Sequence, residues 1–190
     1  QLGVGIEPLG QEVRLEGKTQ VALKEPEAVL DVGNSGTTIR LMAGLLSAQP
    51  MFSALTGDDS LRRRPMDRIV KPLRQMGAEI WGRENGRFAP LAIKGGRLSP
   101  IHSESPIASA QVKTALLLAG LFLEGETSFA EPYLSRDHTE RMLRYMGAEV
   151  ACDQGTVCLR GGQRIEARDI DVPGDPSSAA FLVVGALITS

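Results

Sequence analysis

The sequence has few of the residues that characterise several common classes of protein. It holds one tryptophan, two tyrosines and five phenylalanines, so stacking on bases or sugars is not expected to be its main mode of recognition. Its two cysteines, Cys152 and Cys158, make neither a disulfide framework nor a cysteine-rich metal cluster. This usage favours a reducing, cytoplasmic location, and we expect both cysteines to be small residues of the core.

An excess of positive charge and a long hydrophobic run are also missing. Lysine and arginine total 21 against 23 aspartate and glutamate residues, a net charge of −2, which argues against binding nucleic acid through bulk charge. The longest apolar runs, residues 115–123 and 179–188, are about half of the roughly 20 residues that a membrane helix needs. We therefore expect no membrane span and a largely aliphatic core.

The two ends of the sequence do not look like the ends of a domain. The first residues have the pattern of the end of a helix followed by a strand, and the last twelve lie within an apolar helical stretch that has no C-cap glycine. We therefore expect the chain to be an internal piece of a longer protein.

An internal repeat is the strongest organisational feature. Leu2, Met76 and Met146 each precede a glycine and a β-prone pair, about 70 residues apart. Each copy continues as a hairpin that ends in glycine, at a position where we expect a helix C′ or a tight turn to need positive φ. Residues 35–47, 109–123 and 177–189 are predicted helices that begin at serine and are apolar on nearly every side, so we expect them to be buried. Residues 64–76 and 136–146 are predicted amphipathic helices, with Pro65 in the first turn and Pro72 at a kink. The predicted unit is βαβαββ, an α/β fold with helices inside and sheets outside.

A glycine-rich turn at residues 31–40 (DVGNSGTTIR) precedes the first buried helix. The free N–H groups and positive dipole of a helix start favour an anion there, although a plain N-cap turn explains the same residues. No Gly-Lys-Ser/Thr follows, so the turn is not a Walker A loop.

Four arginines within residues 62–68 precede and open the next helix. Guanidinium groups bind phosphate and carboxylate in a bidentate manner, so the cluster suits a small polyanion. The alternative is a solvated basic turn whose arginines pair with Asp58, Asp59 and Asp67.

Counterparts of these loops recur in the following repeats, at residues 105–113, 135–141 and 172–178. Ser135 is predicted to cap a helix, with Arg136 directed at the ligand or paired with Asp137 or Glu140. His138 has the position of a surface polar residue. Because equivalent loops of repeated units lie on one rim, we expect a site for a substrate with more than one negative charge.

The motifs at residues 33–40, 57–66, 109–113 and 135–141 occur in the order found in the 5-enolpyruvylshikimate-3-phosphate (EPSP) synthase family, which the chain resembles over nearly its whole length. The resemblance implies transfer of the enolpyruvyl group of phosphoenolpyruvate to the 5-hydroxyl of shikimate 3-phosphate, with release of phosphate. It implies no metal or organic cofactor, and inhibition by glyphosate. The implied fold is an inside-out α/β barrel of βαβαββ units, as a monomeric enzyme that binds no nucleic acid and no membrane.

The resemblance also implies site residues. Those for phosphoenolpyruvate are Gly36, Arg64 and Gln111. Those for shikimate 3-phosphate are Thr37, Ser109, Ala110, Gln111, Ser135 and Arg136. The family's catalytic carboxylates fall outside this chain, and Asp175 is not one of them. Residues 1–171 would be most of a first domain and residues 172–190 the crossing to a second, so the piece alone is expected to be inactive.

Two alternatives remain open at this point. The related enolpyruvyl transferase that acts on a UDP-sugar normally has a reactive cysteine in the loop at residues 56–64, where this sequence has none. A noncatalytic module of the same fold that binds phosphorylated ligands or RNA is the other alternative.

Overall fold

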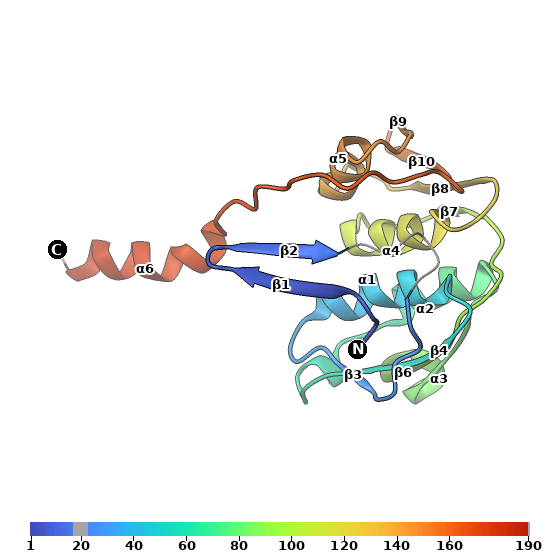
Figure 1. Cartoon of the computed structure of the whole chain (residues 1–190), viewed down its shortest axis with the longest axis horizontal. Helices are drawn as coiled ribbons and strands as arrows, with labels where there is room; N and C mark the ends of the chain where they lie inside the picture. Colours follow the sequence, from blue (N-terminus) through green and yellow to red (C-terminus); the bar gives the residue numbers. More distant parts are fainter. Residues whose placement is uncertain (17–22, 190) are drawn as a thin grey trace.

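The computed structural model describes residues 1–16 and 23–189 of the chain, and the backbone but not the side chains of residues 176–178. Gly17, the expected end of the first hairpin, and the side chain of Ser177, an expected helix cap, therefore lie outside what is described. The described residues form two four-stranded sheets and one two-stranded hairpin. Figure 1 shows helices between the two larger sheets, with the hairpin and the terminal helix extending to one side.

The two sheets have the same topology. The first has the order β3 (Leu30–Asp31), β4 (Phe52–Thr56), β6 (Phe88–Lys94) and β5 (Glu79–Gly82). The second has the order β7 (His102–Glu104), β8 (Glu126–Ala130), β10 (Thr156–Arg160) and β9 (Val150–Asp153). In each sheet the first pair of strands is parallel and the other two pairs are antiparallel.

Each sheet belongs to one βαβαββ unit. The helices of the first unit are α1 (Gly36–Ser47) and α2 (Asp67–Gln75), and those of the second are α4 (Ala110–Gly120) and α5 (His138–Tyr145). Short helical turns, η1 (Leu61–Arg63) and α3 (Arg83–Gly86), lie in the first unit. Two copies of the repeated unit are thus confirmed, while the preceding copy contributes the hairpin of β1 (Gly5–Leu9) and β2 (Glu12–Glu16).

Equivalent backbone closures explain the repeated Met-Gly-Ala motif. Gly77 and Gly147 follow α2 and α5 with φ values of 105° and 92°, a left-handed conformation that glycine adopts without steric cost. The amides of Ala78 and Ala148 donate hydrogen bonds to the carbonyl oxygens of Leu73 and Leu143. These bonds give a partner to a carbonyl group near the end of each helix.

The central helices α1 and α4 pack directly against each other. A Cβ on Gly44 of α1 would lie 2.1 Å from the carbonyl oxygen of Ala115 in α4, so glycine permits this close backbone contact. Helix α4 faces both sheets: Leu116 belongs to the core shared with the first sheet and Leu117 to the core beneath the second. This confirms that the first two predicted apolar helices are buried.

Glycine is needed at the ends of the hairpins for a different reason from the one expected. Their predicted role was positive φ, but Gly95 and Gly161 are needed for space, because a Cβ there would lie 2.0 Å from the Gln49 carbonyl oxygen and 2.1 Å from that of Leu123. Only the following Gly162 has positive φ among these hairpin glycines, at 71°.

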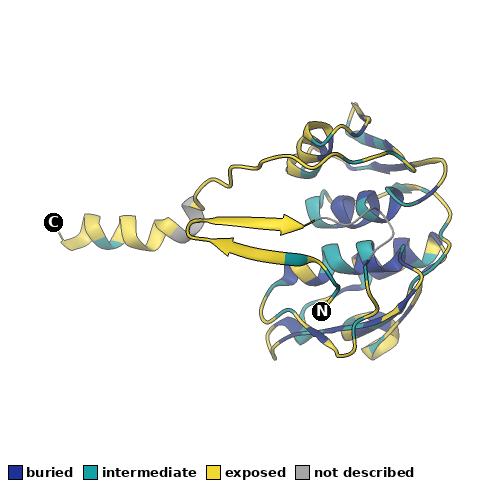
Figure 2. Cartoon of the chain, in the orientation of Figure 1, coloured by how far each residue is buried: buried dark blue, intermediate teal, exposed yellow. Residues whose placement is uncertain are grey.

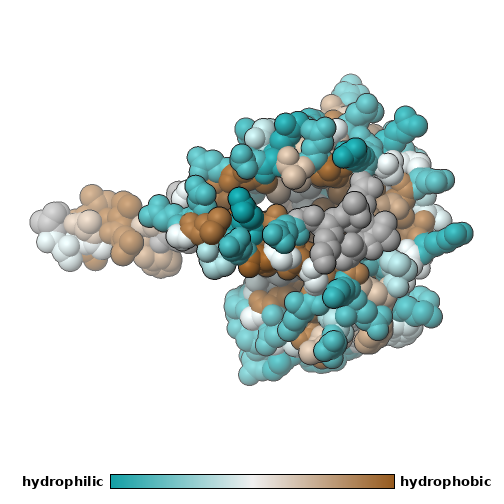
Figure 3. All heavy atoms as spheres, in the orientation of Figure 1, coloured by the Kyte–Doolittle hydropathy of each residue, from teal (hydrophilic) through white to brown (hydrophobic). Residues whose placement is uncertain are grey.

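The third apolar helix differs from its prediction. Helix α6 (Pro176–Thr189) is exposed where its side chains are described, apart from half-buried Gly185, because no other described element packs around it (Figure 2). Figure 3 shows its hydrophobic surface, and Ile6, Val13 and Leu15 on the neighbouring hairpin are also exposed. No helix in the described part of the chain is long and apolar enough to cross a bilayer.

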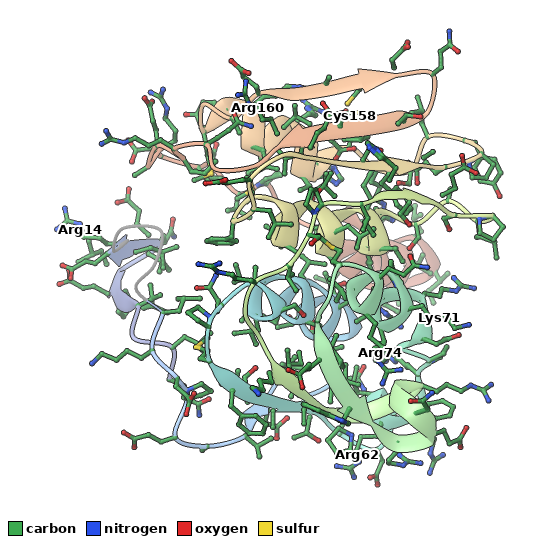
Figure 4. All side chains as sticks on the ribbon, turned by 90° about the vertical axis from the view of Figure 1, so that its right-hand side faces the viewer. Arg14, Arg62, Lys71, Arg74, Cys158 and Arg160 are labelled. Atoms are coloured by element: carbon green, nitrogen blue, oxygen red, sulfur yellow. The ribbon has the colours of Figure 1, made fainter. Side chains whose placement is uncertain are left out.

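Several local predictions are also corrected. Cys152 is exposed and Cys158 only half-buried, because their strands belong to a sheet with one face toward solvent; Figure 4 shows Cys158 on this outer layer. Helix α2 begins at Asp67, so Pro65 precedes its Met66 cap instead of lying in the first turn. Ser135 does not cap α5, whose N-cap is Asp137.

Candidate functional site: a rim of two helix N-termini

The turn between β3 and α1 has the geometry that its sequence predicts. Gly33 has a φ of 57°, and the Ser35 hydroxyl accepts a hydrogen bond of 3.1 Å from the Thr38 amide as the N-cap. Helix α1 then begins at Gly36. Backbone amides at such a start have no partner within the helix and are available to an anion.

A second loop is fastened to this turn. The Asp58 amide donates to the Gly33 carbonyl over 3.0 Å, and the Asn34 Nδ2 donates to Asp58 Oδ2 over 2.7 Å. The Asn34 hydrogen bond and then the Leu61 amide hold the pKa of Asp58 below its usual value. Arg64 Nη2 in turn donates to Asn34 Oδ1 over 2.6 Å. The two loops therefore fix the position of Arg64 relative to the start of α1.

Two guanidinium groups converge above Gly36. A Cβ built on Gly36 would lie 3.0 Å from both Arg40 Nη1 and Arg64 Nη1. Burial lowers the pKa of Arg40, and the charges of Arg64 and Arg68 lower it further, which reflects the concentration of positive charge. Among the ion pairs of the described residues, none involves Arg40 or Arg64. Neither guanidinium group is therefore neutralised by an ion pair, although Arg40 also donates hydrogen bonds to the carbonyl oxygens of Gly36 and Pro65.

The other arginines of the cluster separate into distinct roles. Arg62 pairs with Asp59 and donates to the Gly57 carbonyl over 2.9 Å, as the solvated-turn alternative predicts; Figure 4 shows it at the edge of the molecule. Arg63 is exposed. Asp67 pairs with Lys71 at 3.7 Å instead of with an arginine. The cluster is thus part solvated turn and part candidate anion site.

Gln111 joins the two central helices at their N-terminal ends. Its Oε1 accepts from Arg40 Nη1 over 2.8 Å, and its Nε2 donates to Thr37 Oγ1 over 2.8 Å. The structure thus brings Gly36, Thr37 and Gln111 together from positions more than 70 residues apart. Arg40 is a further candidate site residue that was not predicted, although its position four residues after Gly36 places it on the same helix face.

Glu131 brings the serines of the second unit together. Its Oε1 accepts from the Ser135 amide and hydroxyl, each at 2.8 Å, and its Oε2 accepts from the Ser109 amide at 3.2 Å. Ser109 is also the N-cap of α4, where its hydroxyl accepts from the Val112 amide over 3.4 Å. Ala110 is the first residue of that helix and is half-exposed.

A buried lysine neutralises this carboxylate. The Nζ of Lys113 lies 3.1 Å from Glu131 Oε1 and 2.7 Å from Glu140 Oε1, and all three side chains are at most 2% exposed. Burial alone would lower the pKa of Lys113, but Glu140 and Glu131 outweigh it and raise the pKa. Burial likewise favours a raised pKa for Glu131, but the Ser135 amide and hydroxyl and Lys113 hold it below its usual value. Both partners therefore stay charged at neutral pH.

The remaining predicted residues lie near the start of α5. Arg136 directly follows Ser135 and is exposed. It forms no ion pair with its predicted partners Asp137 and Glu140, and Glu140 is paired with Lys113 instead. His138 is the first residue of the helix and is exposed. Within the described residues, no group of three or more histidine, cysteine, aspartate or glutamate side chains is placed to hold a metal ion.

A separate hollow of about 480 Å³ lies at the edge of the second sheet. His102, Glu104, Ser128 and Gln75 are among its lining residues, and His102 Nδ1 lies 2.7 Å from Ser128 Oγ. None of the predicted site residues lines it. We therefore place the candidate site on the rim of helix N-termini and not in this hollow.

Comparison with known proteins gives one consistent family. The family model described as EPSP synthase (3-phosphoshikimate 1-carboxyvinyltransferase) matches residues 1–190. The chain is 58% identical over 189 residues to the 3-phosphoshikimate 1-carboxyvinyltransferases of Bacillus cereus (strain B4264) and Bacillus thuringiensis (strain Al Hakam), which covers 99% of this chain and 44% of each relative.

The solved structures agree. The EPSP synthase from Acinetobacter baumannii superposes with a TM-score of 0.89 at 50% identity, over 97% of this chain and 42% of that chain. The chain therefore spans less than half the length of the relatives it matches.

Proposed function

Because the chain belongs to the EPSP synthase family, we propose that the protein of which it is a part is a transferase of the shikimate pathway of aromatic amino-acid biosynthesis. It transfers the enolpyruvyl group of phosphoenolpyruvate to the 5-hydroxyl of shikimate 3-phosphate, with release of phosphate. The observation that carries this proposal is the pair of linked helix N-termini, at which Gln111 contacts both Arg40 and Thr37.

The start of α1 suits phosphoenolpyruvate. Arg64 and Arg40 converge above Gly36 without a carboxylate partner, so they can offer charge-assisted hydrogen bonds to a phosphate or carboxylate. The helix N–H groups add a fixed positive dipole that needs no rearrangement. In this proposal Gly36, Arg64 and Gln111 contact phosphoenolpyruvate.

The starts of α4 and α5 suit shikimate 3-phosphate. The proposed contacts are Thr37, Ser109, Ala110, Gln111, Ser135 and Arg136. Exposed Arg136 would supply positive charge, while the serines and Gln111 supply the hydrogen bonds that orient a phosphorylated ring with hydroxyl groups. Gln111 lies at the boundary of the two subsites, where it can hold both substrates close together.

The rest of the protein is proposed to complete the enzyme. Residues 1–171 would form most of one inside-out barrel domain, and residues 172–190 would cross to a second domain that covers the exposed α6. The apolar surfaces of α6 and the β1–β2 hairpin support this, because large exposed apolar patches usually mark contact surfaces. We propose that the chain alone has little turnover and that the whole protein is a monomeric cytoplasmic enzyme.

The test is a phosphate-release assay of the whole protein with phosphoenolpyruvate and either shikimate 3-phosphate or UDP-N-acetylglucosamine. We expect turnover only with shikimate 3-phosphate, and turnover only with the UDP-sugar would overturn the proposal. Arg64→Ala should raise the KM for phosphoenolpyruvate roughly tenfold or more, the scale of a lost hydrogen bond between charged groups. Arg63→Ala, at the exposed neighbouring arginine, is the matched control and should leave that KM unchanged.

A further inference from the structure

Glu131 is a buried carboxylate to which the proposed reaction assigns no role. It lies directly after β8, and its side chain contacts the loop before α5, the start of α4 and Lys113. Its three protein partners besides Lys113 are backbone and hydroxyl groups of Ser109 and Ser135, both proposed to face shikimate 3-phosphate. A buried polar group with so many partners is costly to disturb, because an unpaired charge in a dry site is strongly unfavourable.

We infer that Glu131 is a positioning residue for the shikimate 3-phosphate subsite, where it orients Ser135 and Ser109, and that Lys113 cancels its charge. This inference rests on the proposed function. Without the ammonium group of Lys113, two buried carboxylates would lie beside a site for a phosphate dianion. With it, the local negative charge is reduced and the substrate can approach.

The hydrogen bonds at Glu131 Oε1 also explain how Ser135 can serve a ligand. This oxygen has three donors: the Ser135 amide, the Ser135 hydroxyl and Lys113 Nζ. A carboxylate oxygen has two lone pairs, so one of the three donors is in excess. When the hydroxyl proton turns toward a phosphate oxygen, Glu131 keeps two donors on the same atom. The Ser135 hydroxyl is therefore held in place and yet released at little cost.

The packing of α4 against α5 does not depend on this carboxylate alone. Thr114 Oγ1 lies 2.6 Å from Thr139 Oγ1, and Lys113 also bonds Glu140, so two further links join the helices. A substitution at Glu131 that keeps its volume should therefore disturb the two serines more than the fold.

The test measures steady-state kinetics of the whole protein that carries Glu131→Gln. The side-chain amide has a similar shape but presents an NH2 donor to groups that are themselves donors. We expect the KM for shikimate 3-phosphate to rise roughly tenfold, while the KM for phosphoenolpyruvate changes less than about twofold. Glu124→Gln, an exposed glutamate that precedes β8, is the control and should change neither KM.

A double-mutant cycle separates positioning from general stabilisation. If Glu131 acts through Ser135, Glu131→Gln should raise the KM for shikimate 3-phosphate much less in a Ser135→Ala background than in the wild type. Should Glu131→Gln fail to fold, Glu131→Asp keeps the charge beside Lys113 but withdraws the oxygens from Ser135, and we expect the same split between the two KM values.

The outcomes distinguish this inference from the proposed function. No turnover of the wild-type protein with shikimate 3-phosphate would refute the function itself. Two results would refute the positioning role alone, provided that the wild-type protein turns over normally and the Glu131 variants fold. One is an equal change in both KM values, and the other is an unchanged KM for shikimate 3-phosphate.

Discussion

The N-termini of α1 and α4 are equivalent positions in two copies of one unit, yet their charged side chains are paired differently. At α1, no ion pair among the described residues includes Arg64 or Arg40, and neutral partners such as Asn34 and Gln111 hold these side chains. At α4, Lys113 is buried with two carboxylates and no positive charge is left over. The same helix geometry therefore accompanies two guanidinium groups without an ion pair at one helix start and a buried, paired lysine at the other.

This difference has a physical origin in burial. Arg40 lies in the first turns of α1 and Arg64 directly after η1, and both are partly exposed, so water screens their repulsion. Lys113 lies on a helix that is covered on both sides, where an unpaired ammonium group is not tolerated and must be matched by carboxylates. In the whole protein, substitutions at the buried lysine and between the central helices should therefore change stability more than substitutions at the rim.

Removal of the buried lysine should have the largest effect. Lys113→Met leaves Glu131 and Glu140 without their cation, and we expect the free energy of unfolding to fall by about 3–5 kcal/mol in urea denaturation. Lys71→Met removes an exposed lysine that lies 3.7 Å from Asp67 and should cost less than about 1 kcal/mol. Equal losses of unfolding free energy in the two variants would show that burial does not make the Lys113 pairs more important for stability than the exposed Lys71 pair.

Separation of the two helices should have the next largest effect. Gly44→Ala places a methyl group 2.1 Å from the Ala115 carbonyl oxygen, so α1 and α4 must move apart. We expect a loss of about 1–3 kcal/mol in the free energy of unfolding, because overpacking strains a close-packed core. The same substitution at Gly96, which follows β6 and has no atom within 4 Å of the added Cβ, should instead stabilise by up to about 1 kcal/mol. A neutral Gly44→Ala variant would contradict the close packing.

The stability of the wild type should depend on Glu131 in acid, so the wild type and Glu131→Gln should respond differently to pH. The pKa of Glu131 is lowered on folding, so its contribution to stability is complete above its usual value of 4.5 and is lost as the pH falls through the lower pKa of the folded state. Urea midpoints of the wild type should therefore fall more steeply below pH 4.5 than those of Glu131→Gln. The Glu124→Gln control should follow the wild type, and parallel curves for Glu131→Gln and the wild type would refute the linkage.

The smallest effect on stability is expected at the start of α1. Gly36→Ala brings a methyl group to 3.0 Å from the ends of the Arg40 and Arg64 side chains, which can move, so the free energy of unfolding should change by less than about 0.5 kcal/mol. The displaced guanidinium groups should nevertheless raise the KM for phosphoenolpyruvate several-fold and weaken inhibition by glyphosate. An unchanged inhibition curve would argue against this placement of the phosphoenolpyruvate subsite.

Much of the fold could be predicted from local sequence patterns. The Met-Gly-Ala repeat, the serine caps at Ser35 and Ser109 and the apolar helices 35–47 and 109–123 all depend on residues close together in the chain. Patterns of this kind predicted the repeated unit correctly. They were wrong where a neighbour was needed: α6 has the same apolar pattern as α1 but is exposed, since no described element covers it.

The candidate site was predictable in part. The family resemblance implied Gly36, Thr37, Arg64, Gln111 and both serines as site residues, but it included neither Arg40 nor Glu131. A lysine or glutamate in a sequence normally indicates a solvated surface, so nothing local distinguished Glu131 and Glu140 from the other acidic residues.

The sequence by itself determined the repeated unit, the starts of α1 and α4 and the glycine-rich turn before α1, because these follow from short-range hydrogen bonding and periodicity. Only the tertiary structure decided that Gln111 meets Arg40 and Thr37, and that Lys113 meets Glu131 and Glu140. These contacts depend on which faces of α1, α4 and α5 approach one another. That choice is made by the packing of the whole core, which no single segment of the chain encodes.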